Sequence, residues 1–226
     1  MPTTPAKKRH EAPVYPQTKV SQDDWLALAR ETLVDEGVEH VRILVLAQKL
    51  DVSRSSFYWY FRDRQDLFDE LLAYWRRKNT KAIIDQASRP SETIGQGILN
   101  VFECWTNDDL FDPRLDFAIR EWARRSAKVK DVLHRSDDER VDAITRLFET
   151  HGFRQPEAFI RARIVYFMQI GYYTTEIVEP LEKRLSYLDA YVYSFTGQRP
   201  KEADLERFRQ TARRNGFRAR MSCSSR

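Results

Sequence analysis

The sequence predicts an all-α protein on two observations. Apolar residues recur at helical spacing nearly throughout the 226 residues, and only seven glycines and nine prolines interrupt them. Residues that cap helices stand where the apolar periodicity begins, as at Ser21, Ser53 and Asp63. The length suffices for one large or two small domains with a buried core.

Composition argues against several functional classes. No run of about 18 apolar residues occurs, so we expect no transmembrane helix and no membrane partner. No apolar segment follows the basic residues Lys7 to Arg9, so we expect no secretory signal. Cys104 and Cys223 lie far apart without a CxxC motif, which predicts a reducing cytoplasm and neither a disulfide nor a metal site. Phosphate-loop, GxSxG and HExxH motifs are absent, so we expect no catalytic residues and no cofactor.

The first helix is predicted to begin after Ser21 and to end at Gly37. Residues 1–19, rich in proline, threonine and lysine, are expected to form a disordered arm before it. Ser21 and Asp24 can cap each other, and Trp25 and Leu33 belong to the buried face of this helix. Glycine is the residue most favoured just past a helix end.

Residues 42–61 predict two short helices joined by a tight turn, the pattern of a helix-turn-helix. The first helix has apolar residues at i, i+3, i+4 and i+7, namely Ile43, Leu46, Ala47 and Leu50. Asp51 tolerates the left-handed backbone that such a turn requires, and the Ser53 hydroxyl is expected to cap the second helix. Phe57 and Phe61, four residues apart, are expected to face the first helix.

Six residues of the second helix are then expected to face outward, namely Arg54, Ser55, Ser56, Tyr58, Trp59 and Tyr60. An arginine, hydroxyl groups and exposed rings on one short helix suit the DNA major groove, where bases are read by hydrogen bonds and methyl contacts. Five basic residues stand against two acidic ones between positions 42 and 64, which favours phosphate neutralisation. The alternative is an ordinary helical hairpin whose aromatic residues are buried in a core.

A fourth helix is predicted from Asp63, its N-cap, through Leu67 and Trp75 to about Ser88. Arg64 in its first turn opposes the helix dipole, which leaves a purely structural role poorly motivated. If this helix start abuts the DNA backbone, Arg64 and the free N–H groups hold a phosphate together. We therefore expect a phosphate contact at Arg64.

Residues 21–72 resemble the DNA-binding region of TetR-type transcriptional repressors. The matching segments are Leu46 to Ser53 (LAQKLDVS), the aromatic cluster Phe57 to Phe61, and Arg64 to Leu67 at the start of the fourth helix. The resemblance covers about a quarter of the chain and implies a regulator controlled by an effector, with a phosphate contact at Arg64. Two positions depart from the family pattern, because Asp51 replaces the usual glycine and Arg42 the usual Ser or Thr cap.

Helices are predicted to continue over residues 92–105, 113–125, 127–151, 156–178 and 182–196, with a weaker segment at 202–214. Asp112 is expected to cap the second of these helices, with Pro113 at its first position. The helix at 127–151 is either continuous or broken near residues 136–138. The expected division is an arm (1–19), a helix-turn-helix domain (20–66), a larger domain for ligand binding and dimerisation (67–200) joined through the fourth helix, and a basic tail (201–226). For the tail, a solvated or disordered terminus is the favoured interpretation.

The two late helices, at about 156–178 and 182–196, predict a homodimer interface. Both carry apolar residues on more than one face, so a second surface must cover them. Another subunit would complete a four-helix interface about a two-fold axis, whereas burial in a monomer core is the alternative. The DNA motif favours the dimer, because paired motifs read half-sites about 34 Å apart in a palindromic operator.

The resemblance also implies a small-molecule effector in the larger domain. Candidate pocket residues are Phe102, Trp105, Trp122, Tyr166, Phe167 and Tyr172, with Arg120 and Glu121 as polar candidates. Aromatic residues at helical spacing belong to a core more often than to a pocket. An Arg120 that faced the cavity would favour an anionic effector, because an unpaired buried guanidinium is costly.

The sequence thus predicts a transcriptional regulator, in particular a repressor that leaves a palindromic operator when the effector binds. Base contacts are expected from Arg54, Ser55, Ser56, Tyr58 and Trp59, and phosphate contacts from Arg42, Tyr60 and Arg64, with Ser53 at the start of the same helix. One alternative is a non-specific or architectural DNA-binding protein without an effector. A second is a helical enzyme or carrier of small molecules.

Overall fold

The computed structural model describes residues 20–175 and 177–215, which form helices and contain no strand. The N-terminal part comprises α1 (Gln22–Glu36), η1 (Val38–His40), α2 (Ile43–Lys49), η2 (Arg54–Trp59), α3 (Arg64–Trp75), η3 (Arg76–Thr80) and α4 (Lys81–Ala87). The remainder comprises α5 (Ile94–Glu103), η4 (Cys104–Thr106), α6 (Pro113–Ala123), α7 (Ala127–Thr150), α8 (Glu157–Thr174), α9 (Leu181–Ser186), α10 (Leu188–Thr196) and α11 (Glu202–Arg214). The predicted all-α class is confirmed.

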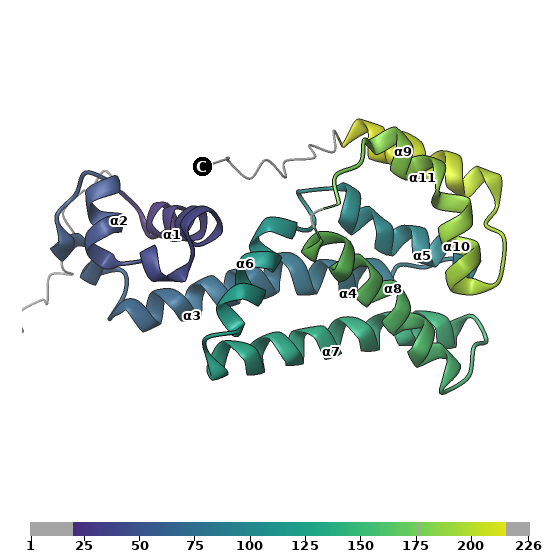
Figure 1. The fold of residues 1–226 in the computed structure, drawn as a ribbon, viewed down its shortest axis with the longest axis horizontal. Coiled ribbons are helices and arrows are strands. Elements are labelled where there is room, and N and C mark those ends of the chain that lie inside the picture. The colour runs from purple at the N-terminus through teal and green to yellow at the C-terminus, as the bar shows by residue number, and fades with distance from the viewer. Residues whose placement is uncertain (1–19, 176, 216–226) are drawn as a thin grey trace, which may run out of the picture.

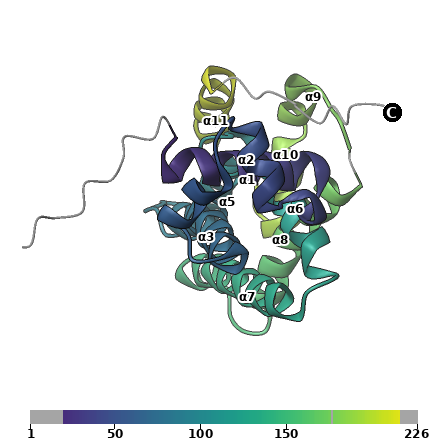
Figure 2. The ribbon, with the colours of Figure 1, turned by 90° about the vertical axis from the view of Figure 1, so that its left-hand side faces the viewer.

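The molecule is elongated, with α1 and α2 at one end and α3 leading from them to a larger lobe (Figure 1). In the view along the long axis, α7 lies on one side of the larger lobe and α9 and α11 on the other (Figure 2). The end formed by α1, η1, α2, η2 and the start of α3 is called the small lobe. It presents its own surface, well separated from α5, α10 and α11. Within the described ranges, no helix is both long and apolar enough to cross a lipid bilayer.

The first helix begins and ends as the sequence predicts. The Ser21 hydroxyl accepts a hydrogen bond from the Asp24 backbone N–H at 3.2 Å, and the Asp24 carboxylate accepts one from the Ser21 N–H at 2.7 Å. Two otherwise unpaired donors at the helix start are thereby satisfied. At the other end Gly37 has φ 87°, a backbone conformation that residues with a Cβ rarely adopt.

The predicted fourth helix is one helical run from Arg64 to Ala87, but its hydrogen bonding changes in the middle. Residues Arg76–Thr80 form a π-helical turn between α3 and α4. This turn buries the side chains of Asn79 and Thr80, which hydrogen-bond to groups of the larger lobe. A π turn within a helix is often found at a functional position.

Several predicted boundaries in the larger lobe differ from the structure. Helix α7 is unbroken, so the possible break near residues 136–138 is absent; Ser136 and Arg140 lie inside the protein instead. Helix α8 ends at Thr174, four residues before the expected end, and the helix expected at 182–196 is divided into α9 and α10 at Tyr187. Asp112 and Pro113 do start α6, with the Asp112 carboxylate accepting from the Leu115 N–H at 3.0 Å.

The expected division at residue 66 does not match the packing of buried side chains. The apolar cluster of the N-terminal part extends along α3 to Trp75 and includes residues of α6 and of the first turns of α7, such as Leu115, Trp122 and Leu133. Phe68 and Trp122 pack edge to face with ring centroids 4.7 Å apart. Helix α6 thus covers α3 and joins the two parts. A division of the chain into continuous segments cannot predict this contact.

The C-terminal segment contains the helix that the sequence predicted more weakly at residues 202–214, so the described part of the expected basic tail is not a solvated terminus. Residues Glu202–Arg214 form α11, and its Leu205, Phe208 and Ala212 are buried in the core of the larger lobe. Arg213 and Arg209 pair with Glu182 and Glu202, so part of the basic charge serves the fold. The expected arm at 1–19 and the last residues of the expected tail, 216–226, lie outside the described part of the chain.

Candidate nucleic-acid interface and ligand cleft

The turn between α2 and η2 has the backbone that the sequence predicts. Asp51 has φ 53°, and it is the one residue other than glycine with a positive φ in the described part of the chain. The Val52 N–H then donates to the Ala47 carbonyl at 3.0 Å, which closes the end of α2. An aspartate tolerates this conformation better than most residues, although glycine would adopt it with less strain.

Helix η2 is held against the small lobe by buried aromatic rings. Phe57 and Phe61 stack with centroids 5.1 Å apart, and Trp25 of α1 meets the Phe57 ring edge to face at 5.3 Å. All three side chains are buried, as expected for Phe57 and Phe61. Because η2 is a 3₁₀ helix of only six residues, this packing rather than its own hydrogen bonds fixes its position.

Four of the predicted contact residues form the exposed side of η2, namely Arg54, Ser55, Tyr58 and Trp59. Tyr58 and Trp59 expose 48% and 44% of their surface, which is high for rings of this size. An Arg54 guanidinium nitrogen donates to the Tyr58 hydroxyl at 3.1 Å, so the two long side chains support each other. Donors, an acceptor and apolar ring surface are therefore offered to one side of the molecule.

Ser53, Ser56 and Tyr60 depart from the expectations. The Ser53 hydroxyl caps no backbone N–H of η2 and instead contacts the Ser55 hydroxyl at 2.8 Å. Ser56 is buried and donates to the Ser53 carbonyl at 2.8 Å, because a tight 3₁₀ turn brings these two residues together, so an outward-facing Ser56 is wrong. Tyr60 is half-buried, and its hydroxyl donates to the Val20 carbonyl at 2.9 Å, so its one proton is already used.

The two arginines expected at phosphate have structural partners. Arg42 precedes α2 without capping it, and its Nε donates to the Glu39 carbonyl at 2.8 Å. Arg64 donates to the carbonyls of Val41 and Val38 at 2.7 and 3.0 Å, and partial burial lowers its pKa. Arg64 thus ties the start of α3 to the segment before α2, a structural role that the sequence reading considered poorly motivated.

Two further features near this surface were not predicted from the sequence, namely ion pairs of its basic residues and an exposed leucine. Lys49 pairs with Glu36, and Arg62 with Asp66, so two of the five basic residues in this region have acidic partners. Leu44 exposes 57% of its surface on α2. Leu44 lies outside the apolar stripe of that helix, and this position could have predicted its exposure.

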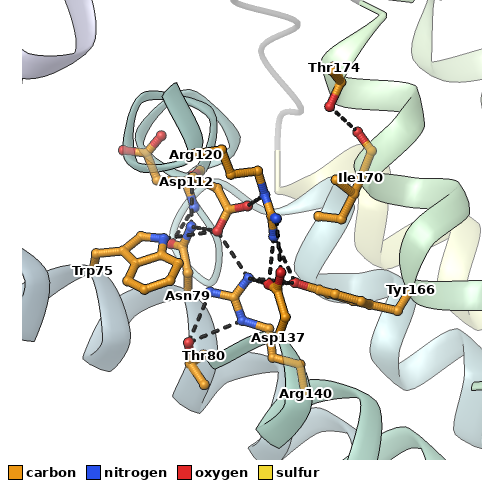
Figure 3. A network of polar contacts seen from close by, with 11 residues as sticks. Trp75, Asn79, Thr80, Asp112, Arg120, Asp137, Arg140, Tyr166, Ile170 and Thr174 are labelled. Carbon is orange, nitrogen blue, oxygen red and sulfur yellow. Dashed lines mark hydrogen bonds and ion pairs between the residues drawn. The ribbon is translucent and has the colours of Figure 1, made fainter. Parts of the chain in front are cut away.

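Behind the small lobe lies a buried polar network of eight residues, Trp75, Asn79, Thr80, Asp116, Arg120, Asp137, Arg140 and Tyr166. Figure 3 labels all of them except Asp116. At its centre, fully buried Arg140 donates to Asp116 at 3.0 Å, to Tyr166 at 2.8 Å and to Thr80. Asp116 also accepts from the Trp75 indole at 2.8 Å. The network thereby joins α3, the π turn, α6, α7 and α8.

The charges of this network balance within the protein. Arg120 makes two hydrogen bonds to Asp137, at 2.7 and 3.0 Å, and one to Asp116 at 2.9 Å. Burial by itself would raise the pKa of Asp116, but the charges of Arg140 and Arg120 outweigh it and hold that pKa below its ordinary value. Burial likewise raises the pKa of Tyr166, so its phenol stays neutral and donates to Asp137 at 2.6 Å.

A small cleft in the larger lobe is partly open to solvent. Its lining residues are Phe102, Trp105, Thr106, Met168, Gln169, Tyr172, Glu179, Arg184, Leu185, Tyr187, Leu188, Tyr191 and Phe208. Three of the predicted pocket residues, Phe102, Trp105 and Tyr172, are among them. The cleft lies between α5, η4, α8, α9, α10 and α11, so its walls come from segments far apart in sequence.

The other predicted pocket residues lie elsewhere. Arg120 and Tyr166 belong to the polar network, where Arg120 is paired with two carboxylates. The condition stated for an anionic effector, an unpaired Arg120 that faces the cavity, is therefore not met. Trp122 packs on Phe68 in the cluster of the small lobe. Phe167 faces outward on α8 and exposes 42% of its surface. No group of three or more potential metal ligands occurs among the described residues, and burial raises the pKa of the Cys104 thiol to about 12.

The comparisons with known proteins find a family likeness in one stretch of the chain. Residues 26–71 match the family model of bacterial regulatory proteins of the tetR family. This stretch extends from α1 into α3 and contains α2, the turn and η2, so the resemblance drawn from the sequence is confirmed there. No curated protein matches the chain.

Three solved structures are similar to this chain, each at low sequence identity and low TM-score. BioQ in complex with its natural double-stranded DNA operator is 18% identical, with a TM-score of 0.38 over 80% of this chain and 100% of that one. A putative TetR-family transcriptional regulator from Mesorhizobium loti MAFF303099 is 15% identical, with a TM-score of 0.47 over 84% and 92%. Mycobacterium smegmatis BioQ is 19% identical, with a TM-score of 0.37 over 88% and 100%. The likeness to the tetR family therefore rests on residues 26–71.

Replacing Asp116 by Asn should lower the free energy of unfolding by about 3 kcal/mol at pH 7, because Arg140 loses its buried countercharge. Since the pKa of folded Asp116 lies below its ordinary value of 3.8, its contribution is complete above that pH and disappears as the pH falls further. Urea unfolding of both proteins from pH 7 to pH 3 should show the difference narrowing below pH 3.8. Asp85→Asn, in an exposed pair with Lys81, is the control and should change little. An equal effect of the two variants at pH 7 would contradict the assignment.

Proposed function

We propose that this chain, whose residues 26–71 match the TetR family, is a sequence-specific transcriptional repressor that binds a palindromic operator as a homodimer and leaves it when an effector binds. The observation that carries the proposal is the exposed side of η2, where Arg54, Ser55, Tyr58 and Trp59 stand on a rigid aromatic support. A short helix with donors and apolar rings at one end of an elongated molecule suits insertion into a major groove.

The structure refines which residues we propose for each contact. Arg54 and Ser55 supply hydrogen bonds to base edges, and Tyr58 and Trp59 supply ring surface for thymine methyl groups. Arg42, Ser53 and Arg64 contact phosphate; Arg64 has five N–H donors and uses only part of them on the Val38 and Val41 carbonyls. Ser56 is excluded because it is buried, and Tyr60 supports the lobe through Val20.

The dimer interface is proposed on the outer side of α8 and α10. Ile160, Ile164 and Phe167 of α8 expose between 42% and 52% of their surface, and Tyr193 of α10 exposes 46%. Residues 160, 164 and 167 recur at helical spacing, so these side chains share one face. An apolar stripe of this kind is costly in water, and a second copy of the same stripe across a two-fold axis would cover it.

Release by an effector is proposed to pass through α8. Met168, Gln169 and Tyr172 of this helix line the cleft, and Tyr166, one turn earlier, is held in the polar network. The network reaches α3 through the hydrogen bond from Trp75 to Asp116, and α3 is the next helix after η2 in the chain. A ligand that favours another position of α8 would thus change the distance between the two η2 helices of the proposed dimer.

Operator binding tests the proposed contacts. Arg54→Ala should weaken binding to an operator by about 1–3 kcal/mol and relax the preference at one base pair. Ser55→Ala should also lose selectivity, whereas Ser56→Ala should mainly lower stability, because Ser56 is buried. Fluorescence anisotropy on DNA from the protein's own promoter region and on random DNA, at the same salt concentration, measures this.

Arg146→Ala, an exposed arginine near the far end of α7, is the matched control and should leave DNA binding unchanged. If Arg54→Ala loses as much affinity for random DNA as for the operator, Arg54 contacts only the DNA backbone. Equal affinity of the wild-type protein for both DNAs, vanishing as salt rises, would favour the non-specific or architectural alternative.

Ile164→Glu should convert the dimer to a monomer, because it places a charge in the proposed apolar interface, and operator affinity should fall with it. Sedimentation velocity measures the mass of the wild-type protein and of the variant. Ala203→Glu, on the exposed side of α11, is the control and should leave the mass unchanged. A wild-type monomer, or a dimer that tolerates Ile164→Glu, would remove the interface from α8.

Tyr166→Phe should weaken the effect of a ligand without removing either binding site. The variant deletes the hydroxyl that contacts Arg120, Arg140 and Asp137 but keeps the ring and the cleft. For a compound that releases the wild-type protein from DNA, coupling between sites is typically about 1–3 kcal/mol, and it should shrink in the variant. Titration of the compound with and without DNA gives the coupling, and an undiminished value would exclude this route.

A further inference from the structure

The turn between α6 and α7 carries an excess of positive charge at the end of the larger lobe nearest the small lobe. We infer that this basic turn, defined as residues 121–135, contacts the DNA backbone while η2 occupies the major groove. The inference rests on the proposed DNA binding and adds to it a contact that strengthens binding without reading the sequence.

The small lobe by itself has the wrong charge for a polyanion. Residues 20–66 contain six basic and nine acidic residues, a net charge of −3 at pH 7. The basic excess between positions 42 and 64 is offset by six acidic residues of α1 and the segment after it, namely Asp23, Asp24, Glu31, Asp35, Glu36 and Glu39. Double-stranded DNA carries one negative charge per about 1.7 Å of its axis, so it repels such a lobe. Positive charge elsewhere at this end of the molecule would offset the repulsion.

The basic turn has the opposite balance. Its five basic residues stand against two acidic ones, a net charge of +3, and all seven are exposed: Arg124, Arg125, Lys128, Lys130 and Arg135 against Glu121 and Asp131. Within the described ranges, the side chains of Arg125, Lys130 and Arg135 make no hydrogen bond or ion pair, and Arg124 makes only a long one, 3.8 Å from Glu121. Exposed charges of one sign without partners attract a partner of the opposite sign.

Contacts with α3 place the basic turn beside the small lobe. Lys128, in the first turn of α7, pairs with Asp69 of α3 at 2.6 Å, and Trp122 at the end of α6 packs on Phe68. In Figure 1 the turn lies below α3, at the end of α7 that is nearer the small lobe. Figure 2 looks along the molecule from the small lobe, and there α1 and α2 do not cover the turn. The basic turn and η2 therefore face the same end of the molecule.

Insertion of η2 brings the DNA backbone towards the basic turn. The major groove is about 12 Å wide and about 8.5 Å deep, so its two phosphate strands rise beside a helix that reaches the base edges. Long arginine and lysine side chains extend towards them, and charges within about 8 Å still attract at physiological salt. Because every sequence presents the same phosphates, this contact strengthens binding to all DNA alike.

Arg125→Gln combined with Lys130→Gln should weaken binding to DNA from the protein's own promoter region and to random DNA by the same factor. Each phosphate contact that is lost lowers the slope of log affinity against log salt by about 0.9, so this double variant should lower it by about 1.8 per bound chain. Its loss of affinity should be about tenfold larger at about 50 mM salt than at about 200 mM. Fluorescence anisotropy of the full-length protein over this range measures both quantities.

Arg146→Gln combined with Arg154→Gln is the matched control. It removes the same charge from exposed side chains at or just after the far end of α7, so the salt slope should not change. Arg125→Lys combined with Lys130→Arg keeps the charge of the basic turn and should keep the wild-type slope. An unchanged slope in the glutamine variant of the turn would overturn the inference and leave this surface to an acidic protein partner. An equal fall in the control, or a fall in the variant that keeps the charge, would also overturn it.

The two DNAs separate this inference from the proposed function. Selective operator binding, with a salt slope that does not depend on Arg125 and Lys130, would refute the basic turn alone. Equal affinity of the wild-type protein for both DNAs, with a slope that falls in the glutamine variant, would support the basic turn and refute the proposed repressor. No binding to either DNA would refute both.

Discussion

The buried ion pair between Arg140 and Asp116 is the interaction on which the rest of the structure depends. Both side chains are removed from water, and a lone charge in that place would be very unfavourable, so each requires the other. Their remaining hydrogen-bonding groups are taken up by Trp75 and Tyr166 and by Thr80 in the π turn. Such a network permits few alternative arrangements, and it fixes α3, α6, α7 and α8 relative to one another.

In the small lobe the short helix η2 is held in place while one of its sides stays exposed. Hydrogen bonds within six residues of 3₁₀ helix are too few for this, so the stacked rings of Phe57 and Phe61 and the edge of Trp25 supply the support. Arg64 adds two hydrogen bonds to the segment before α2. Because the support comes entirely from one side of η2, the opposite side remains open to a partner.

Helix α8 connects the three surfaces on which the proposed function depends. Its outer face carries exposed Ile160, Ile164 and Phe167, Tyr166 enters the polar network, and Gln169 lines the cleft. A helix that is apolar on several sides needs several partners, and here they are the core, a proposed second subunit and a proposed ligand. One rigid element in contact with all three gives a physical basis for coupling them, although each contact has its own chemistry.

The sequence by itself determined the helical class, the caps at Ser21 and Asp112, the left-handed turn at Asp51 and the outward residues Arg54, Ser55, Tyr58 and Trp59. These follow from periodicity and backbone preferences, which act over a few residues. Tertiary structure alone decided that Arg120 and Tyr166 belong to a network, that Trp122 supports α3, and that Gln169 and Phe208 line a cleft. The charged Arg140 among the core positions of α7 was the one local signal of that network. Its partners could not be foreseen, because Asp116, Thr80 and Tyr166 lie 24 to 60 residues away in sequence and meet it only when the helices pack.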